Sequence, residues 1–144
     1  MTDASLTASA VMSHLAAQEQ AAEQFYRGLA ARFAPQQAVW SRCAQACAKN
    51  QVQVARSYQE TISDALEVGY TFAGLTLDAT PVPCADALAD LAAAVEQALA
   101  LEERAASAYE QVAECAEGLL ATIPRTLRRA AEIRRRNAAL IAAL

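Results

Sequence analysis

The chain has 144 residues, of which 55% are hydrophobic and 19% are charged, and its formal net charge is −4. This length accommodates one domain with a buried core, and the composition excludes a disordered chain. Four glycines and four prolines are too few turn residues for a many-stranded β protein. The negative net charge argues against a nucleic-acid-binding protein. No apolar run reaches the roughly eighteen residues of a membrane-spanning helix, so we expect neither a nucleic acid nor a membrane as partner.

The N-terminal stretch MTDASLTASAVMSHLA lacks the basic region and apolar segment of a secretion signal. We therefore expect a cytoplasmic protein. The four cysteines are then expected to be thiols, because disulfides are rare in that compartment.

The first half of the chain predicts two helices. The first begins between Asp3 and Ser9 and runs to about Phe33, because its apolar residues recur at helical spacing. Glu19 and Tyr26 fall on the same stripe. Pro35 marks a turn, and a second helix is expected over residues 36–68. The inward residues expected of the two helices are Val11, Leu15, Ala22, Phe25, Leu29 and Phe33, then Trp40, Cys43, Cys47, Asn50 or Gln51, Val54 and Tyr58.

Residues 69–84, GYTFAGLTLDATPVPC, have no helical period and are long for a turn between helices. We interpret them as a crossover packed over the bundle. A third helix is expected from about Ala85 to Glu117, ended by Gly118, and a fourth with Pro124 in its first turn. The inward residues expected are Leu88, Leu91, Val95, Leu99, Glu102, Ala106, Tyr109, Val112 and Ala116, then Leu127, Ala130, Ala131, Arg134, Asn137, Ala138 and Ile141.

The sequence therefore predicts an all-α fold in a single domain over residues 1–144. Hairpin 1 covers about 3–68, the crossover about 69–84 and hairpin 2 about 85–144. Two helical hairpins joined by one long connection make a four-helix bundle.

A glutamate followed seven residues later by a tyrosine occurs once in each hairpin. Glu19 and Tyr26 form the first pair, and Glu102 and Tyr109 form the second at a constant offset along the chain. The constant offset indicates an internal repeat. A carboxylate on an apolar stripe is costly unless it binds, pairs or reacts with something, so both pairs are candidate site residues.

These pairs, the aromatic dipeptide Phe25-Tyr26 and the long crossover resemble the ferritin-like superfamily, most closely its rubrerythrin-type branch. The resemblance covers nearly the whole chain. It implies two iron or manganese ions in the bundle core, held by one glutamate from the first helix of each hairpin and a Glu-x-x-His from the second. It also implies oxidase or peroxidase chemistry.

The second half of that ligand set is missing here. The Glu-x-x-His positions fall on Cys47-x-x-Asn50 and on Arg134-x-x-Asn137, and the only histidine, His14, has no counterpart in the second hairpin. Two carboxylates, a thiol, two amides and a guanidinium do not make a carboxylate-bridged di-metal centre. We therefore interpret the site as degenerate, with no catalytic residue, no bound metal and no cofactor; its vestigial residues are Glu19, Tyr26, Cys47, Asn50, Glu102, Tyr109, Arg134 and Asn137.

Arg134 is the most informative of these substitutions. An arginine keeps its charge inside a protein, and Glu19 and Glu102 are the nearest expected anions. We hypothesise that its guanidinium stands where a metal stood, with Tyr26 and Tyr109 bonding the same carboxylates. The alternative is a slightly rotated fourth helix that points Arg134 to solvent.

Two other features have alternative readings. Cys43 and Cys47 lie one helical turn apart and form an alternative site for one zinc or copper ion, although buried cysteines also act as small apolar core residues. Arg128, Arg129, Arg135 and Arg136 form a basic face that suits an anion, a nucleic acid or an acidic partner, although no aromatic residues interleave with the arginines as nucleic-acid binding favours. That face also suits solvent opposite acidic residues of the third helix, which are Glu103, Glu110 and Glu114.

Three functions remain open from the sequence. The first is a non-catalytic, metal-free bundle that works as a homodimer or by binding a protein partner. The second is a carrier or sensor with a thiophilic ion at Cys43 and Cys47. The third is a diverged di-iron oxidoreductase, which the positive charge of Arg134 disfavours.

Overall fold

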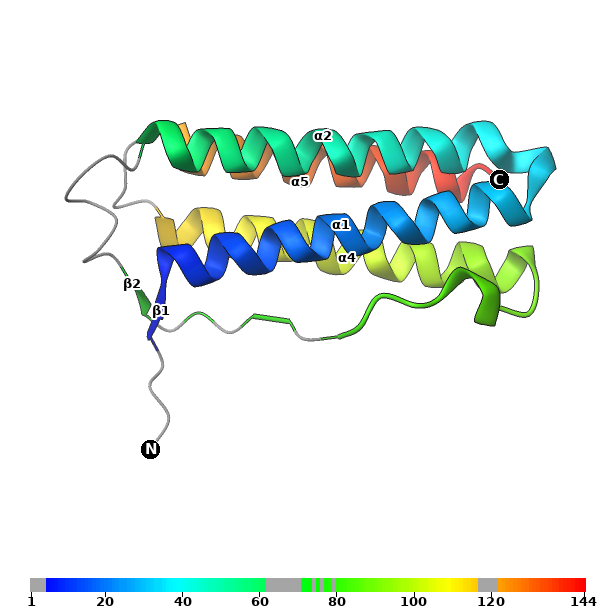
Figure 1. Cartoon of the computed structure of the whole chain (residues 1–144), viewed down its shortest axis with the longest axis horizontal. Coiled ribbons are helices and arrows are strands. Elements are labelled where there is room, and N and C mark those ends of the chain that lie inside the picture. The colour runs from blue at the N-terminus through cyan, green and yellow to red at the C-terminus, as the bar shows by residue number, and fades with distance from the viewer. Residues whose placement is uncertain (1–4, 62–70, 74, 76, 79, 117–121) are drawn as a thin grey trace.

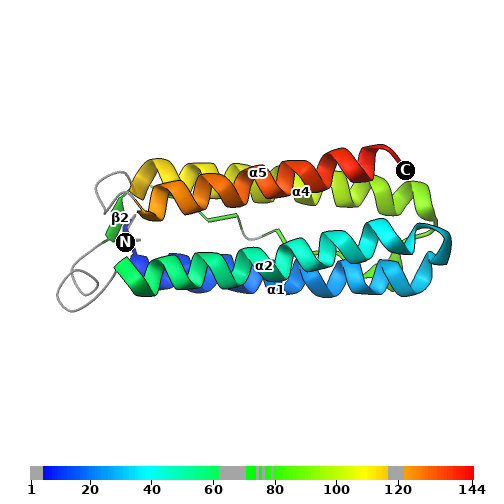
Figure 2. The same ribbon diagram turned by 90° about the horizontal axis from the view of Figure 1, so that it is seen from above.

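The computed structural model describes residues 5–61, 71–73, 75, 77–78, 80–116 and 122–144. It confirms the all-α four-helix bundle (Figure 1). The helices are α1 (Ala8–Arg32), α2 (Gln37–Thr61), α4 (Leu91–Cys115) and α5 (Thr122–Ala142). Helices α1 and α2 pack as one antiparallel hairpin and α4 and α5 as another, and the two hairpins also meet where α2 packs on α5 (Figure 2).

The helix ends follow local capping chemistry. The Thr7 side chain accepts a hydrogen bond of 3.0 Å from the amide of Ala10, which satisfies one free donor at the start of α1. Pro35 lies in a 3-10 turn, Ala34–Gln36, where the chain reverses into α2. Pro124 lies in the first turn of α5, as the sequence predicts.

The predicted start of the third helix, near Ala85, is wrong. Ala85–Ala87 form a separate 3-10 turn, and α4 begins at Leu91. The Asp90 carboxylate accepts a hydrogen bond of 2.9 Å from the amide of Ala93, so Asp90 is the N-cap. This capping residue sets the boundary, because it satisfies the first amides of the helix that follows.

The connection between the hairpins runs along the length of the bundle. We call the described part of residues 71–90 the strap; it lies along the seam between α1 and α4 (Figures 1 and 2). Near one end, β2 (Thr71–Ala73) pairs antiparallel with β1 (Ser5–Thr7), with Leu6 opposite Phe72. The sequence does not predict this two-stranded ladder, which joins the start of α1 to the strap.

Two contacts fix the other end of the strap. Arg32 donates to the carbonyl oxygens of Ala85 at 2.8 Å and Ala89 at 3.2 Å. Ala85 packs directly over Gly28, where a β-carbon would lie 2.7 Å from that of Ala85. A glycine is therefore needed at this position of α1 for the strap to pack as closely as it does.

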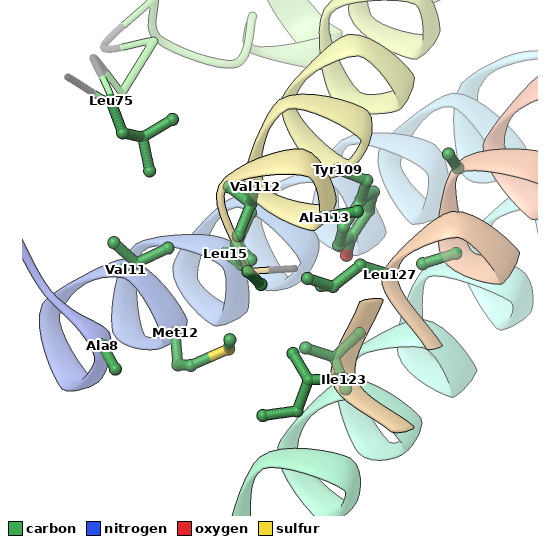
Figure 3. Close-up of a cluster of buried hydrophobic side chains, with 14 of the residues drawn as sticks. Ala8, Val11, Met12, Leu15, Leu75, Tyr109, Val112, Ala113, Ile123 and Leu127 are labelled. Atoms are coloured by element: carbon green, nitrogen blue, oxygen red, sulfur yellow. The ribbon is translucent and has the colours of Figure 1, made fainter. Parts of the chain in front are cut away.

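The core consists of two apolar clusters, one toward each end of the bundle. The Leu15 cluster includes Val11, Leu15, Val112, Ile123 and Leu127, which Figure 3 shows pointing toward one another from α1, α4 and α5. The Trp40 cluster includes Phe25, Leu29, Trp40, Leu101 and Ile141. Glu19, Glu102 and Arg134 are buried with them.

The predicted inward faces hold for α1, for the described part of α2 and for α5, apart from three partly buried positions. Phe33, Tyr58 and Ala138 are those positions. For the first half of α4 the prediction is off by one position. Ala94 and Ala98 are fully buried, whereas Val95 and Leu99 are half-buried and pack against the Trp40 cluster from its side. Small side chains take the centre of this helix face, and the large ones flank it.

Some expectations concern residues outside the described ranges, including the end of the second helix after Thr61 and the cap at Gly118. In the part of the chain that is described, no helix combines the length and apolar character needed to cross a bilayer.

Candidate functional site: a buried arginine between two glutamates

Arg134 of α5 lies in the core between the two repeated glutamates and is only 1% exposed. Its Nε and Nη2 donate to Oε1 and Oε2 of Glu102 at 2.6 and 3.0 Å, a bidentate pair. Its Nη1 donates to Oε1 of Glu19 at 2.5 Å. One guanidinium therefore links α1, α4 and α5. The solvent-facing orientation considered for Arg134 is not the one in the structure.

The two tyrosines complete the carboxylate contacts in a crossed arrangement. Tyr26 of α1 donates its hydroxyl to Oε2 of Glu102 on α4. Tyr109 of α4 donates its hydroxyl to Oε2 of Glu19 on α1. Each tyrosine thus bonds the glutamate of the other hairpin, so the repeated pairs hold the two hairpins together.

The two asparagines predicted to belong to the site, Asn50 and Asn137, differ in their surroundings. Asn50 donates to Oε2 of Glu19 at 3.2 Å and to the carbonyl oxygen of Ala130 at 3.3 Å. Asn137 Nδ2 is buried and has no hydrogen-bond partner among the described residues. The two asparagines therefore occupy similar positions in the two hairpins but do not make equivalent hydrogen bonds.

All four carboxylate oxygens of the site accept hydrogen bonds from protein donors. Glu19 accepts from Arg134, Tyr109 and Asn50, and Glu102 accepts from Arg134 and Tyr26. Buried charges persist in proteins when they are paired and hydrogen-bonded. This network meets that requirement with side chains of the chain itself.

Burial shapes the ionisation of these groups. It raises the pKa of Tyr26 and of Tyr109 well above the ordinary value, and the charge of the bound carboxylate raises both further. Burial also raises the pKa of Glu102, while the charge of Arg134 opposes that change. Burial alone would lower the pKa of Arg134, but the negative charges of Glu19 and Glu102 outweigh it and leave that pKa above its usual value. The guanidinium is charged and both phenols are donors at neutral pH.

Cys43 and Cys47 lie in the same buried region. Burial raises the pKa of the Cys43 thiol to about 12, and the charge of Glu102 adds to that rise. Burial also raises the pKa of Cys47, despite the opposing charge of Arg134. Without a metal, both thiols of the alternative site therefore keep their protons at neutral pH.

The donor set does not fit the di-metal centre that the sequence resemblance implies. The guanidinium of Arg134 lies between the two carboxylates, and a positive charge there repels a metal cation. Within the described ranges, no three histidine, cysteine, aspartate or glutamate side chains are grouped so that they could hold a metal ion.

The basic face of α5 is partly paired with α4. Arg135 donates to Glu110 at 2.8 Å and to Glu103 at 3.3 Å, and all three side chains are exposed. One of the two interpretations of the basic face from the sequence was a solvent-exposed surface opposite these acidic residues, and the Arg135 contacts agree with it. Exposed pairs of this kind contribute little stability.

Two contacts near the site were missed from the sequence. Trp40 stacks on Tyr26 with ring centroids 5.9 Å apart, which fixes the ring that donates to Glu102. Asp78 of the strap lies 3.7 Å from Arg104 of α4. The strap has no helical period, so the sequence pattern could not predict the contact between Asp78 and Arg104.

Compared with known protein families, curated proteins and solved structures, the chain has no match.

Proposed function

We propose that this protein is a non-catalytic, metal-free bundle of ferritin-like, rubrerythrin-related descent, in which Arg134 replaces metal between Glu19 and Glu102. One observation carries the proposal: protein donors satisfy all four carboxylate oxygens of the two repeated glutamates. A resident metal would have to displace a buried guanidinium from both carboxylates.

The proposed role of the cluster is structural. It ties α1, α4 and α5 together through charged and hydrogen-bonded contacts in the middle of the core. Function then rests with the surface, and we propose that the protein acts as a homodimer or by binding another protein.

The descent is an argument by analogy of fold and residue pattern, and such an analogy does not transfer activity. What supports it is the repeat itself: the glutamate and tyrosine of each hairpin meet at one point of the bundle. The missing Glu-x-x-His ligands support the loss of oxidase or peroxidase chemistry.

Elemental analysis tests the metal-free proposal. The protein is produced in medium supplemented with iron, manganese, zinc and copper, then purified without chelators. We expect far less than one equivalent of each metal per chain. Two equivalents of iron or manganese would overturn the proposal, and one equivalent of zinc or copper lost in Cys47→Ser would replace it with the thiol site.

Sedimentation analysis tests the assembly proposal separately. A concentration-dependent dimer of the purified chain supports the homodimer. A monomer at all concentrations removes the homodimer and leaves a different protein as the proposed partner.

A further inference from the structure

A cavity beneath the strap is separate in its chemistry from the Arg134 network. It has a volume of about 210 Å³ and lies between the strap, α1 and α4. A smaller cavity of about 40 Å³ continues from it toward Glu19, Tyr109 and Arg134. Both cavities are lined by His14, Asp78, Arg104 and Ala108, so they are neighbours. For comparison, an apolar cavity of about 150 Å³ is large enough to bind benzene.

The wall of the larger cavity has an apolar side. Leu75 and Leu77 come from the strap, and Ala108 and Val112 come from α4. Leu75 and Val112 are buried, and both belong to the Leu15 cluster (Figure 3). This side suits a short hydrocarbon chain or an aromatic ring, because burial of apolar surface is favourable.

The charged group of the cavity wall is Arg104 of α4, which lies on the same helix face as Ala108 and Val112. Among the described residues, none accepts a hydrogen bond from its guanidinium. Its side chain is 30% exposed, and its one ion pair with a described residue joins Nε to Oδ2 of Asp78 at 3.7 Å. That distance is too long for a hydrogen bond. A guanidinium has five donors in a planar fork that matches a carboxylate. By contrast, Arg134 and Arg135 each donate at 2.8 Å or less to a glutamate.

Asp78 is held mainly by the strap rather than by Arg104. Its Oδ1 accepts a hydrogen bond of 2.9 Å from the amide of Thr80. Hydrogen bonding by the side chain and the amide of Thr80 is also the main reason that the pKa of Asp78 is lowered, with Arg104 and His14 contributing less. Arg104 and His14 therefore both face a carboxylate that neither binds tightly.

The other acidic residue of the cavity wall is already engaged. Glu103 accepts hydrogen bonds from Ser107 at 3.2 Å and from Arg135 at 3.3 Å. Among the described residues that line the cavity, the basic side chains are Arg104 and His14, and Asp78 is the acid that interacts with both. The cavity thus combines an available guanidinium with an apolar wall.

We propose that this cavity binds a small monocarboxylate with a short aliphatic or aryl tail. The ligand carboxylate takes the place of Asp78 at Arg104 and forms a bidentate pair with the guanidinium. The tail packs against Leu75, Leu77 and Val112. Ligand binding sites commonly have this composition, with mostly apolar walls and a few placed polar groups. The inference goes beyond the proposed function and does not depend on it, because Arg104 takes part in none of the hydrogen bonds that hold the Arg134 network among the described residues.

Binding of hexanoate and benzoate, measured by calorimetry and by ligand-observed NMR, tests the proposal. Hexylamine and hexanol serve as probes of the same tail without the carboxylate. We expect both acids to bind in the millimolar range or tighter and the amine and alcohol to bind at least tenfold more weakly. We expect Arg104→Gln to weaken hexanoate binding at least tenfold.

Asp78→Asn should change hexanoate binding in the direction opposite to Arg104→Gln. It removes the competing carboxylate, so hexanoate binding should strengthen severalfold, which a purely structural role of Asp78 does not predict. Arg136→Gln is the matched control, since Arg136 is exposed and belongs to α5, and it should leave binding unchanged. Circular dichroism and thermal unfolding confirm that each variant is folded.

Three results would overturn the proposal. The first is that neither acid binds saturably to the wild-type protein. The second is that hexanoate and hexylamine bind equally well. The third is that folded Arg104→Gln binds hexanoate as tightly as the wild type does. The metal content of Arg104→Gln and Asp78→Asn should match the wild type in every case, so failure here is distinguishable from failure of the metal-free proposal.

Discussion

Tyr26 of α1 donates its hydroxyl to Glu102 of α4, and the equivalent tyrosine of α4 donates to Glu19 of α1. The two contacts cross between the hairpins instead of staying within each one. Arg134 then bridges both carboxylates from α5. The central network is therefore held jointly by the hairpins, and removal of one member affects both.

Replacement of either tyrosine by phenylalanine should destabilise the fold. Each change removes one hydrogen bond to a buried charged carboxylate, which typically contributes about 1.5–3 kcal/mol. We expect Tyr26→Phe and Tyr109→Phe to lower the free energy of unfolding in urea by similar amounts. As a control, Tyr26→Phe should cost less in a Glu102→Gln background, because the carboxylate that it serves is gone. Equal cost in both backgrounds would contradict the assigned contact.

The close packing of the strap on α1 predicts coupling between Gly28 and Ala85. A β-carbon at Gly28 would lie 2.7 Å from that of Ala85, and overpacking of this kind costs about 1–3 kcal/mol. Gly28→Ala should therefore be destabilising despite the better helix propensity of alanine. Ala85→Gly should relieve the clash, so a double-mutant cycle in urea should give a favourable coupling of about 1–3 kcal/mol. Additive effects would show that the strap does not pack there.

The cysteines should differ sharply in reactivity with an alkylating reagent at pH 8. Cys84 is exposed, whereas Cys43 and Cys47 are fully buried. Only the thiolate reacts, and the pKa of Cys43 lies at about 12. Mass spectrometry of the native protein should show rapid labelling at Cys84, with Cys43 and Cys47 labelled only after denaturation. Rapid native labelling of Cys47 would contradict its place in the core.

The raised pKa of Cys43 also predicts lower stability at alkaline pH. Between the ordinary pKa of 9.0 and the folded-state value of about 12, the unfolded thiol loses its proton while the folded one keeps it. The folded state then binds more protons, so the free energy of unfolding falls as pH rises, by about 1.4 kcal/mol per pH unit for one group. Urea unfolding at pH 9 and pH 10.5 should show this fall.

Cys43→Ala is the control for the alkaline effect. This variant lacks one of the groups that titrate, so its free energy of unfolding should fall less steeply with pH. The remaining slope should come from Cys47 and the two tyrosines. An unchanged pH dependence would mean that Cys43 titrates in the folded state as it does in the unfolded one.

The helices and the identity of the central residues could be predicted because they depend on local patterns. Apolar residues at helical spacing place Leu15, Leu29 and Ile141 inward, and all three are buried. The same spacing puts Arg134 on the inward face of α5, between Ala130, which is buried, and Ala138, which is half-buried. These inferences need no knowledge of how the helices meet.

The strap and the crossed contacts could not be predicted because they depend on distances between elements. Tyr26 reaches Glu102 only because α1 and α4 meet at that depth and angle, which no single-helix pattern encodes. The start of α4 had a readable signal, since Asp90 precedes an apolar helix as an N-cap residue does. Leu91, Val95 and Leu99 were expected to take the centre of the inward face, but Ala94 and Ala98 do so.

Urea unfolding of Arg134→Ala tests most directly whether Arg134 is the cation that holds this core together. The change leaves Glu19 and Glu102 buried without their positive partner, and breaking a buried ion pair in this way costs about 3–5 kcal/mol. Arg136→Ala, an exposed arginine of the same helix, should cost under about half a kcal/mol. A loss of about 3–5 kcal/mol for Arg134→Ala alone would support the account, and a loss no larger than that of Arg136→Ala would contradict it.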